Sequence, residues 1–232
     1  MRAPRALVTG CSSGIGAAVV DRLLAGNWQV IGVSRSTPPT RAGARWLSAD
    51  LTDVAAVPAV LADVGHLDAV VHAAGVQRSA RLGSLSAADG ALMWRLHVDA
   101  ATAVVDAVID RVRDGGRIVV MGSRTATGVA GKSQYAATKA ALLGLTRSWA
   151  MELAGRRVTV NVVAPGPTDT PMLTDPGREA TPPQPPPLGR FVRPAEVAAL
   201  TAFLLGPEGG MITGQQLVMC GGASLCLPPA PL

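Results

Sequence analysis

The chain of 232 residues is poor in lysine and in aromatic side chains. Its only lysines are Lys132 and Lys139, Tyr135 is its only tyrosine, and aromatic residues make up 3% of the sequence. The net charge of +5 therefore comes from arginine, and the arginines are dispersed along the chain. Nucleic-acid interfaces usually carry clustered basic residues, often with aromatics between them. The charge thus predicts a solvated surface without a nucleic-acid partner, and it stays compatible with a small anionic ligand.

Cysteine and histidine are equally scarce, with three of each. They are Cys11, Cys220, Cys226, His66, His72 and His97. No C-x-x-C spacing occurs, so a zinc site is not expected, and the odd cysteine count favours a reduced protein. No apolar run approaches the ~18 residues that a membrane span needs, and residues 1–9 lack the long apolar segment of a signal peptide. We therefore expect a cytoplasmic protein with no metal and no membrane partner.

The chain has ample apolar surface, because 48% of its residues are hydrophobic and only 16% are charged. This composition excludes intrinsic disorder, and the length predicts a single domain over residues 1–232. Short apolar runs predict strands at 6–9, 29–33, 46–49, 67–71, 117–121, 158–163 and 216–219. Helical spacing predicts helices at 15–25, 54–64, 96–112, 134–153 and 194–205. The alternation of the two predicts an α/β fold, with a parallel sheet of about seven strands covered by helices on both faces.

Proline marks two irregular stretches. Residues 181–187 read Thr-Pro-Pro-Gln-Pro-Pro-Pro, which excludes a helix or a central strand. We expect an extended surface loop there, as part of a loop region over 167–193 that borders the substrate. The tail 225–232 is predicted to be irregular.

A glycine-rich turn follows the first predicted strand and opens the first predicted helix. It reads Thr9-Gly-Cys-Ser-Ser-Gly-Ile-Gly16. In this position Gly10 allows the tight exit from the strand, and Gly14 lets the backbone approach a pyrophosphate at the helix N-terminus. Gly16 allows close packing of helix on strand. The alternative is that the glycines are structural punctuation only, but their place in the βαβ pattern favours dinucleotide binding.

The end of the second strand indicates which dinucleotide is bound. Proteins that bind NAD usually carry an acid there, which holds the ribose 2′-hydroxyl, whereas those that bind NADP use an arginine. This strand ends in Val33-Ser34-Arg35-Ser36, with no acid. We therefore favour NADP(H) over NAD(H), unless Arg35 is a solvent-facing side chain of no consequence.

Tyr135 and Lys139 are four residues apart on a predicted helix and so share one face. A nearby ammonium favours the phenolate, so we expect Lys139 to lower the pKa of Tyr135 toward the working range of a general acid or base. The alternative is a coincidental pair in which the tyrosine is half-buried.

With these features in view, the chain resembles the short-chain dehydrogenase/reductase family. The motifs occur in the family's order from residue 7 to about 222. They are the glycine-rich turn, Ala73-Ala74-Gly75, a serine after the fifth strand, Tyr135-x-x-x-Lys139 and Asn161-Val-Val-Ala-Pro-Gly166. The resemblance implies a Rossmann fold that assembles as a homo-oligomer, a tetramer or a dimer.

The resemblance also implies roles for individual residues. Tyr135 would exchange a proton with the substrate oxygen, Ser123 would position that oxygen, and Lys139 would bind the nicotinamide ribose. Cofactor contacts are implied for Gly10, Ser12, Ser13, Gly14, Ile15, Gly16, Arg35, Asp50, Leu51, Ala73, Gly75, Tyr135, Lys139, Pro165, Gly166 and Thr170. Asp50 and Leu51 would meet the adenine, Gly75 its ribose, and the last three the nicotinamide end.

The chain departs from the family pattern at several positions. The family has an asparagine on the helix after the fourth strand, where it steadies a relay water, and the matching residue is His97. Its imidazole either takes over the proton relay or is satisfied locally. His72, at a strand end, is expected to be structural. The spacing from Ser123 to Tyr135 is one residue short, so Thr125 is an alternative hydroxyl. Cys11 is either a small filler or a thiol made acidic by the helix N-terminus.

The leading hypothesis is an NAD(P)-dependent oxidoreductase that moves a hydride between nicotinamide and a ketone or secondary alcohol. A catalytically impaired dinucleotide-binding sensor or subunit is the alternative, favoured by His97. Epimerisation or dehydration is less well supported. The substrate is expected over the carboxyl ends of the strands, between segments 77–82, 123–134 and 167–190.

Overall fold

The computed structural model describes residues 2–179 and 181–225. Within these residues, seven parallel strands form one sheet in the order β3-β2-β1-β4-β5-β6-β7. The strands are β1 (Arg5–Thr9), β2 (Gln29–Ser34), β3 (Ala44–Ser48), β4 (Leu67–His72), β5 (Val112–Met121), β6 (Thr159–Pro165) and β7 (Gln216–Met219). The predicted parallel α/β fold is confirmed. The tail from 226 onward lies outside the described residues.

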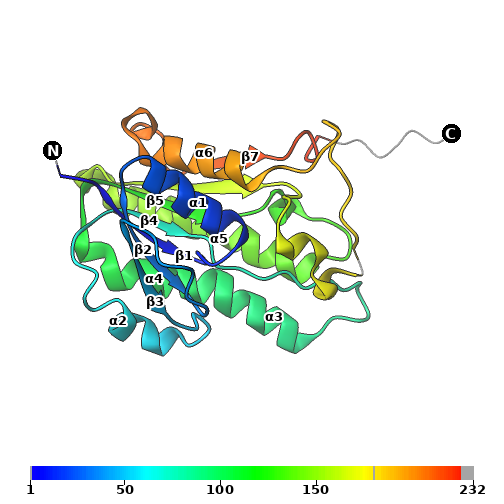
Figure 1. Ribbon diagram of the computed structural model, residues 1–232. Coiled ribbons are helices and arrows are strands. Elements are labelled where there is room, and N and C mark those ends of the chain that lie inside the picture. Colours follow the sequence, from blue (N-terminus) through cyan, green and yellow to red (C-terminus); the bar gives the residue numbers. More distant parts are fainter. Residues whose placement is uncertain (1, 180, 226–232) are drawn as a thin grey trace.

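Helices cover both faces of this sheet (Figure 1). They are α1 (Gly14–Ala25), α2 (Val57–Val60), α3 (Ala87–Trp94), α4 (Ala100–Val108), α5 (Ser133–Leu153) and α6 (Pro194–Leu205). Buried side chains of α1 and α6 join one core cluster, and those of α2, α4 and α5 join the other. The architecture is therefore a doubly wound three-layer sandwich.

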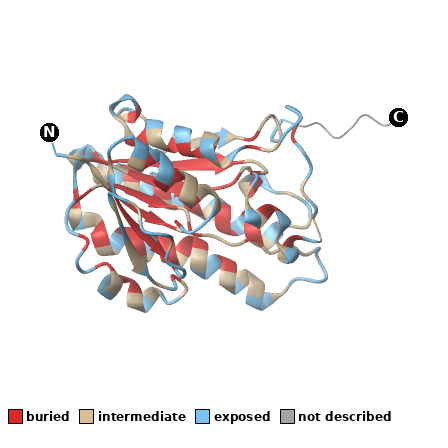
Figure 2. Ribbon diagram, viewed as in Figure 1, coloured by how far each residue is buried: buried red, intermediate tan, exposed pale blue. Residues whose placement is uncertain are grey.

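The central strands are buried on both faces, as Figure 2 shows by their red colour. In β1, Leu7 packs into the cluster under α4, whereas Ala6 and Val8 pack into the cluster under α1 and α6. Successive side chains of a strand point to opposite faces. A strand between two helical layers thus needs apolar residues at every position, which is why these strands appear in the sequence as short unbroken apolar runs.

One long helix is where the structure differs most from expectation. The sequence predicts a helix over 96–112, but the observed helical run lies earlier in the chain. It begins with α3, continues through a π-helical turn (Arg95–Asp99) and ends with α4. Ser86 caps α3 by accepting a hydrogen bond from the backbone N–H of Asp89. This Ser-x-x-Asp start is a local signal that the sequence reading missed. Val112, predicted to end the helix, is the first residue of β5.

The helix predicted over 54–64 is also wrong in length. Only a 3₁₀ turn (Val54–Ala56) and the single turn of α2 form there. Pro58 is tolerated because it lies at the start of α2, where its missing N–H would have no helical partner. The strand predicted over 46–49 runs instead over β3, two residues earlier at its start. The proline-rich stretch 181–187 contains no helix or strand, as predicted.

The sheet reverses its direction of growth between β1 and β4. From β1 the chain adds β2 and β3 on one side, and β4 to β7 on the other. A crevice opens at such a switch point beyond the carboxyl ends of the strands. The glycine-rich turn after β1 and the Ala73–Gly75 segment after β4 lie on the two sides of this point.

Candidate active site

The first of two adjoining cavities lies at the switch point and has a volume of about 460 Å³. Twelve of the predicted cofactor residues line it. They are Gly10, Ser12, Ser13, Gly14, Ile15, Gly16, Arg35, Asp50, Leu51, Ala73, Gly75 and Thr170. We call this cavity the dinucleotide cleft. It brings together the ends of β1, β2, β3 and β4, which local sequence signals had pointed to separately.

The glycines of the turn are required by close backbone approach. Gly10 has a φ of +65°, and a Cβ on it would lie 2.7 Å from backbone atoms of Ala74. A Cβ on Gly16 would overlap the carbonyl oxygen of Gly10. Gly14 has a φ of +55°, and its Cβ position faces the side chain of Thr170 at 3.2 Å. The turn therefore leaves bare backbone beside the N-terminus of α1, which suits the pyrophosphate of a dinucleotide.

The adenosine end of the cleft contains one basic and one acidic side chain. Arg35 is exposed just beyond β2, in a part of the cleft that carries no acid from that strand. Asp50 already accepts hydrogen bonds from the backbone N–H and the hydroxyl of Thr52, at 2.9 and 2.8 Å. These bonds, more than the distant charge of Arg35, lower the pKa of Asp50.

Cys11 does not carry an acidic thiol. Burial raises its pKa, an effect that outweighs the hydrogen bond its Sγ makes to the hydroxyl of Ser34. The thiol is almost fully buried and fits against Gly32, whose Cβ position lies 2.7 Å from Sγ. The interpretation of Cys11 as a small filler agrees with this packing, and the alternative of an acidic thiol does not.

The second cavity adjoins the cleft and has a volume of about 90 Å³. We call it the substrate cavity. Its polar lining includes Ser123, Thr125 and Tyr135, together with Pro165 and Gly166 from the end of β6. The three segments expected to surround a substrate all contribute to it. Ser123, rather than Thr125, is the hydroxyl that hydrogen-bonds the phenol of Tyr135.

The pKa of Tyr135 is raised, contrary to the expectation from its spacing to Lys139. Burial of the ring is the largest cause, because a phenolate loses its hydration there. The hydrogen bond with Ser123 and the positive charge of Arg178 pull the pKa down, but less strongly. The sequence suggested the wrong cation, since Lys139 is not among the groups that lower it.

Lys139 is buried on the same face of α5 as Tyr135. Its Nζ lies 5.8 Å from the centre of the Tyr135 ring and donates a hydrogen bond to the carbonyl of Met121 at 2.9 Å. Burial lowers its pKa to about 7, so the ammonium loses much of its charge near neutral pH. The carbonyl of Met121 uses one of the N–H donors of Lys139, and at least one more remains for a ligand in either protonation state. Its Nζ also lies 3.7 Å from the Cβ position of Gly75, at the boundary of the cleft.

His97 lies in the π-helical turn and is completely buried. The backbone N–H of Val76 donates to its Nε2 at 3.1 Å, so the proton of the neutral ring is on Nδ1. Nδ1 then donates to the hydroxyl of Thr138 at 2.8 Å, which donates in turn to the carbonyl of Tyr135. Burial holds the pKa of His97 well below its ordinary value. Both ring nitrogens are therefore occupied, which favours local satisfaction over a proton relay.

His72 has a comparable structural position at the end of β4. Thr9 accepts two hydrogen bonds, from the backbone N–H groups of Ala73 and Ala74, so its own hydroxyl proton goes to Nδ1 of His72. Nε2 of His72 then donates to the carbonyl of Leu96. Burial lowers the pKa of His72 to about 4. The ring thus ties β1 and β4 to the π-helical turn.

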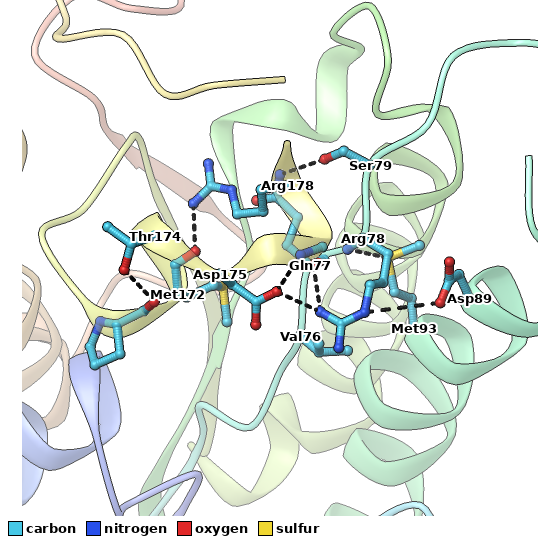
Figure 3. Close-up of polar contacts among 12 residues, drawn as sticks. Val76, Gln77, Arg78, Ser79, Asp89, Met93, Met172, Thr174, Asp175 and Arg178 are labelled. Atoms are coloured by element: carbon cyan, nitrogen blue, oxygen red, sulfur yellow. Dashed lines mark hydrogen bonds and ion pairs between the residues drawn. The ribbon is translucent and has the colours of Figure 1, made fainter. Parts of the chain in front are cut away.

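Several residues of this region were missed by the sequence reading. Two short 3₁₀ turns (Pro171–Thr174 and Pro176–Arg178) lie within the expected loop 167–193. Figure 3 shows them bridged to the segment after β4 by an ion pair between Arg78 and Asp175, at 3.1 Å. The second turn brings the buried side chain of Arg178 into the substrate cavity, which Lys132 and Arg124 also line. An arginine in a loop gives no sequence signal of burial.

Residues 10–224 match a family model described as enoyl-(acyl carrier protein) reductase. The solved structure of a short-chain dehydrogenase/reductase from Serratia marcescens aligns with 95% of this chain and 98% of its own, at 31% identity and a TM-score of 0.82. This chain belongs to the short-chain dehydrogenase/reductase family. As a member of it, the protein is an NAD(P)-dependent oxidoreductase.

Other similar proteins include a reductase and a protein solved with NADPH. The 3-oxoacyl-[acyl-carrier-protein] reductase FabG of Escherichia coli is 36% identical over 94% of this chain and 96% of its own. A blue fluorescent protein from a metagenomic library, solved in complex with NADPH, is 33% identical over 95% of this chain and 97% of its own, with a TM-score of 0.84.

None of the helices in residues 2–179 and 181–225 is long and apolar enough to cross a membrane.

Proposed function

We propose that this protein uses NADPH to reduce a ketone to a secondary alcohol, or catalyses the reverse reaction, with Tyr135 as the general acid or base. One observation carries the proposal. The phenol of Tyr135, hydrogen-bonded to Ser123, lines a small cavity that adjoins the dinucleotide cleft. A carbonyl in that cavity would lie between a proton donor and the nicotinamide end of a bound cofactor.

The cleft fits a dinucleotide, since its glycines leave bare backbone and its length runs from Arg35 to Thr170. The glycine-rich turn would hold the pyrophosphate, Asp50 and Leu51 the adenine side, and Pro165, Gly166 and Thr170 the nicotinamide side. Bound NADPH supplies the hydride. The protein supplies the geometry and the proton.

The raised pKa of Tyr135 suits the reductive direction. At neutral pH the phenol keeps its proton and can donate it to the oxygen that gains negative charge as the carbonyl is reduced. Ser123 donates a second hydrogen bond to that oxygen and so orients it. Lys139, with free N–H donors beside Gly75, would hold the nicotinamide ribose. His97 acts as a positioning residue, through Thr138 and the backbone of Tyr135.

The preference for NADPH rests on Arg35. A 2′-phosphate at the adenosine end would meet its guanidinium at the mouth of the cleft, where no acid from β2 would repel it. The similar protein solved with NADPH supports the same choice.

Tyr135→Phe tests the assignment, because it removes the phenolic oxygen and keeps the ring. We expect turnover of a ketone panel, followed by NADPH absorbance, to fall by about 10³-fold or more. NADPH affinity, measured by calorimetry, should stay within about threefold, since the phenol takes no part in anchoring the adenosine half. Ser123→Ala should give a smaller loss of turnover.

Two outcomes would contradict the proposal. A Tyr135→Phe variant with the wild-type rate would remove Tyr135 from the chemistry. Tight NADPH binding with no turnover of any ketone or secondary alcohol would instead favour the alternative of a dinucleotide-binding sensor.

We further propose that the protein is a homo-oligomer, a tetramer or a dimer. Strand β7 is at the edge of the sheet, and Val218 on it and Phe203 on α6 are 46% and 43% exposed. Apolar side chains at an open sheet edge favour association with a second copy. Light scattering coupled to size-exclusion chromatography measures the oligomeric state, and a monomer at micromolar concentration would refute the proposed homo-oligomer.

A further inference from the structure

The substrate cavity contains an unusual excess of positive charge. Arg124, Lys132 and Arg178 all line it, and no aspartate or glutamate does so among the described residues. The charges act on one another. The pKa of Lys132 is lowered to about 8, first by burial and then by the charges of Arg178 and Arg124. Three cations in a small volume repel one another, and no carboxylate among the described residues of the cavity offsets this repulsion. Burial lowers the pKa of Arg178 more strongly than Asp175, outside the cavity, raises it.

Arg178 is the most informative of the three. The residue is only 8% exposed, and its Nε is buried without a hydrogen-bond partner. One terminal nitrogen donates to the carbonyl of Met172 at 3.0 Å, as Figure 3 shows. A buried guanidinium is normally paired with an anion, because an unpaired buried charge loses its hydration without gaining a compensating interaction.

The nearest candidate anion of the chain is engaged elsewhere. Asp175 accepts from Nη1 of Arg78 at 3.1 Å and from the backbone N–H of Gly177 at 2.7 Å. Within the described residues, neither Arg178 nor Lys132 has a carboxylate within 4.0 Å. The Arg78–Asp175 pair instead anchors the turn that carries Arg178, so the guanidinium is held in place with its Nε free.

We propose that Arg178 binds an anionic group of the substrate, so that the natural substrate is a small oxo acid whose carboxylate lies beside the reacting carbonyl. The inference rests on the proposed function, since Tyr135 and Arg178 line the same cavity. A planar guanidinium matches a carboxylate through paired hydrogen bonds, and Lys132 adds a second positive charge. The volume of about 90 Å³ suits a molecule of few heavy atoms.

The anionic group takes no part in the bond changes. A hydride adds to the carbonyl carbon, the carbonyl oxygen takes the proton of Tyr135, and NADP⁺ and a hydroxy acid result. The carboxylate enters and leaves unchanged. Its pairing with Arg178 orients the carbonyl toward Ser123 and Tyr135, which makes charge a determinant of specificity.

The first experiment uses the wild-type protein alone. Short 2-oxo and 3-oxo acids are each paired with their methyl esters, and kcat/KM is measured with saturating NADPH. We expect at least one acid to exceed its ester by about 10- to 100-fold, the range of a hydrogen-bonded charge. If every reduced ester equals or exceeds its acid, the anion site is refuted while the proposed ketone reduction stands.

The second experiment changes the guanidinium. Arg178→Gln should lower kcat/KM for the acid by about 10- to 100-fold and leave the ester within about threefold. Arg178→Lys keeps the charge but lacks the planar guanidinium. Its kcat/KM for the acid should therefore lie between those of the wild type and of Arg178→Gln. Arg147→Gln, at an exposed position of α5, is the matched control and should leave kcat/KM for both the acid and the ester unchanged.

The remaining outcomes are separated by binding measurements. If Arg178→Gln weakens NADPH binding instead of discriminating acid from ester, the anion that Arg178 meets belongs to the cofactor and the proposal fails. If no pair is reduced, the proposed function fails. The anion site is then tested by titrating malonate into the protein with NADPH bound, where binding lost in Arg178→Gln supports it and absent binding refutes it.

Discussion

The dinucleotide cleft and the substrate cavity adjoin each other but are built in different ways. The cleft is built around bare backbone of the glycine-rich turn, and most of its lining comes from short segments that directly follow β1, β2, β3 and β4. The substrate cavity is made of side chains from separate segments, and Arg124 and Arg178 are 54 positions apart (178 − 124). Backbone shape follows local sequence rules, whereas a set of converging side chains depends on how distant segments pack.

The two regions also differ in electrostatics. The cleft is an open crevice at a helix N-terminus, with Arg35 and Asp50 exposed. The substrate cavity is lined by buried and half-buried ionisable groups, and burial is the first cause of the shifted pKa of Tyr135 and of Lys132. The comparison predicts that the cleft recognises the body of its ligand by shape, with Arg35 adding charge at one end, and that the cavity selects its ligand by charge.

The largest expected effect comes from adding a methyl group to the cleft. Gly10→Ala puts a Cβ 2.7 Å from the backbone of Ala74 at a φ of +65°, a conformation that is itself unfavourable for alanine. We expect about 3 kcal/mol of destabilisation and loss of NADPH binding. Chemical denaturation and calorimetry measure the two effects.

Gly144→Ala is the matched control for this change. Gly144 lies in α5 with nothing within 4 Å of its Cβ position, so alanine should stabilise the protein by about 0.5–1 kcal/mol. Equal effects at Gly10 and Gly144 would show that the cleft does not depend on bare backbone.

A pH profile examines the buried chemistry of the substrate cavity. Reduction needs the protonated phenol, and burial raises the pKa of Tyr135, so kcat/KM for an uncharged methyl ester, which does not depend on the charge of Lys132, should be level from pH 6 to 9. It should fall about tenfold per pH unit only above the ordinary tyrosine pKa of about 10. A fall with a midpoint near pH 7 would instead point to Lys139, whose pKa is about 7.

His97→Asn sharpens the same profile. Asparagine cannot titrate, and it is too short to satisfy both Val76 and Thr138. If His97 only positions its neighbours, the variant should melt at a lower temperature while the shape of the pH profile stays unchanged. A variant whose pH profile changes shape would restore the relay hypothesis.

The smallest effect is expected at the exposed end of the cleft. Arg35→Gln should weaken NADPH binding by about 10- to 30-fold, because a phosphate loses a charged partner, and should leave NADH binding within about twofold. Arg22→Gln, exposed on α1 outside the cleft, is the control. Equal weakening of both cofactors would make Arg35 a general contact and remove the argument for NADPH.

The prediction of the fold succeeded where the signals were local. The apolar runs of β1 and β4 reflect burial on both faces, and the turn at Gly10–Gly16 reflects close backbone approach. The long helix was misplaced because its start depends on the Ser86 cap, and because the π-helical turn around His97 disguises the helical period. The 54–64 segment has apolar residues at helical spacing, but tertiary packing leaves only one α-helical turn there.

The sequence by itself determined the order of strands and helices, the glycine turn and the pairing of Tyr135 with Lys139 on one helical face, because these follow from repeating periods and short-range sterics. The tertiary structure decided the ionisation of that pair and the entry of Arg178 into the cavity. The physical reason is that burial sets the energy of a charge, and burial depends on residues brought together from distant parts of the chain.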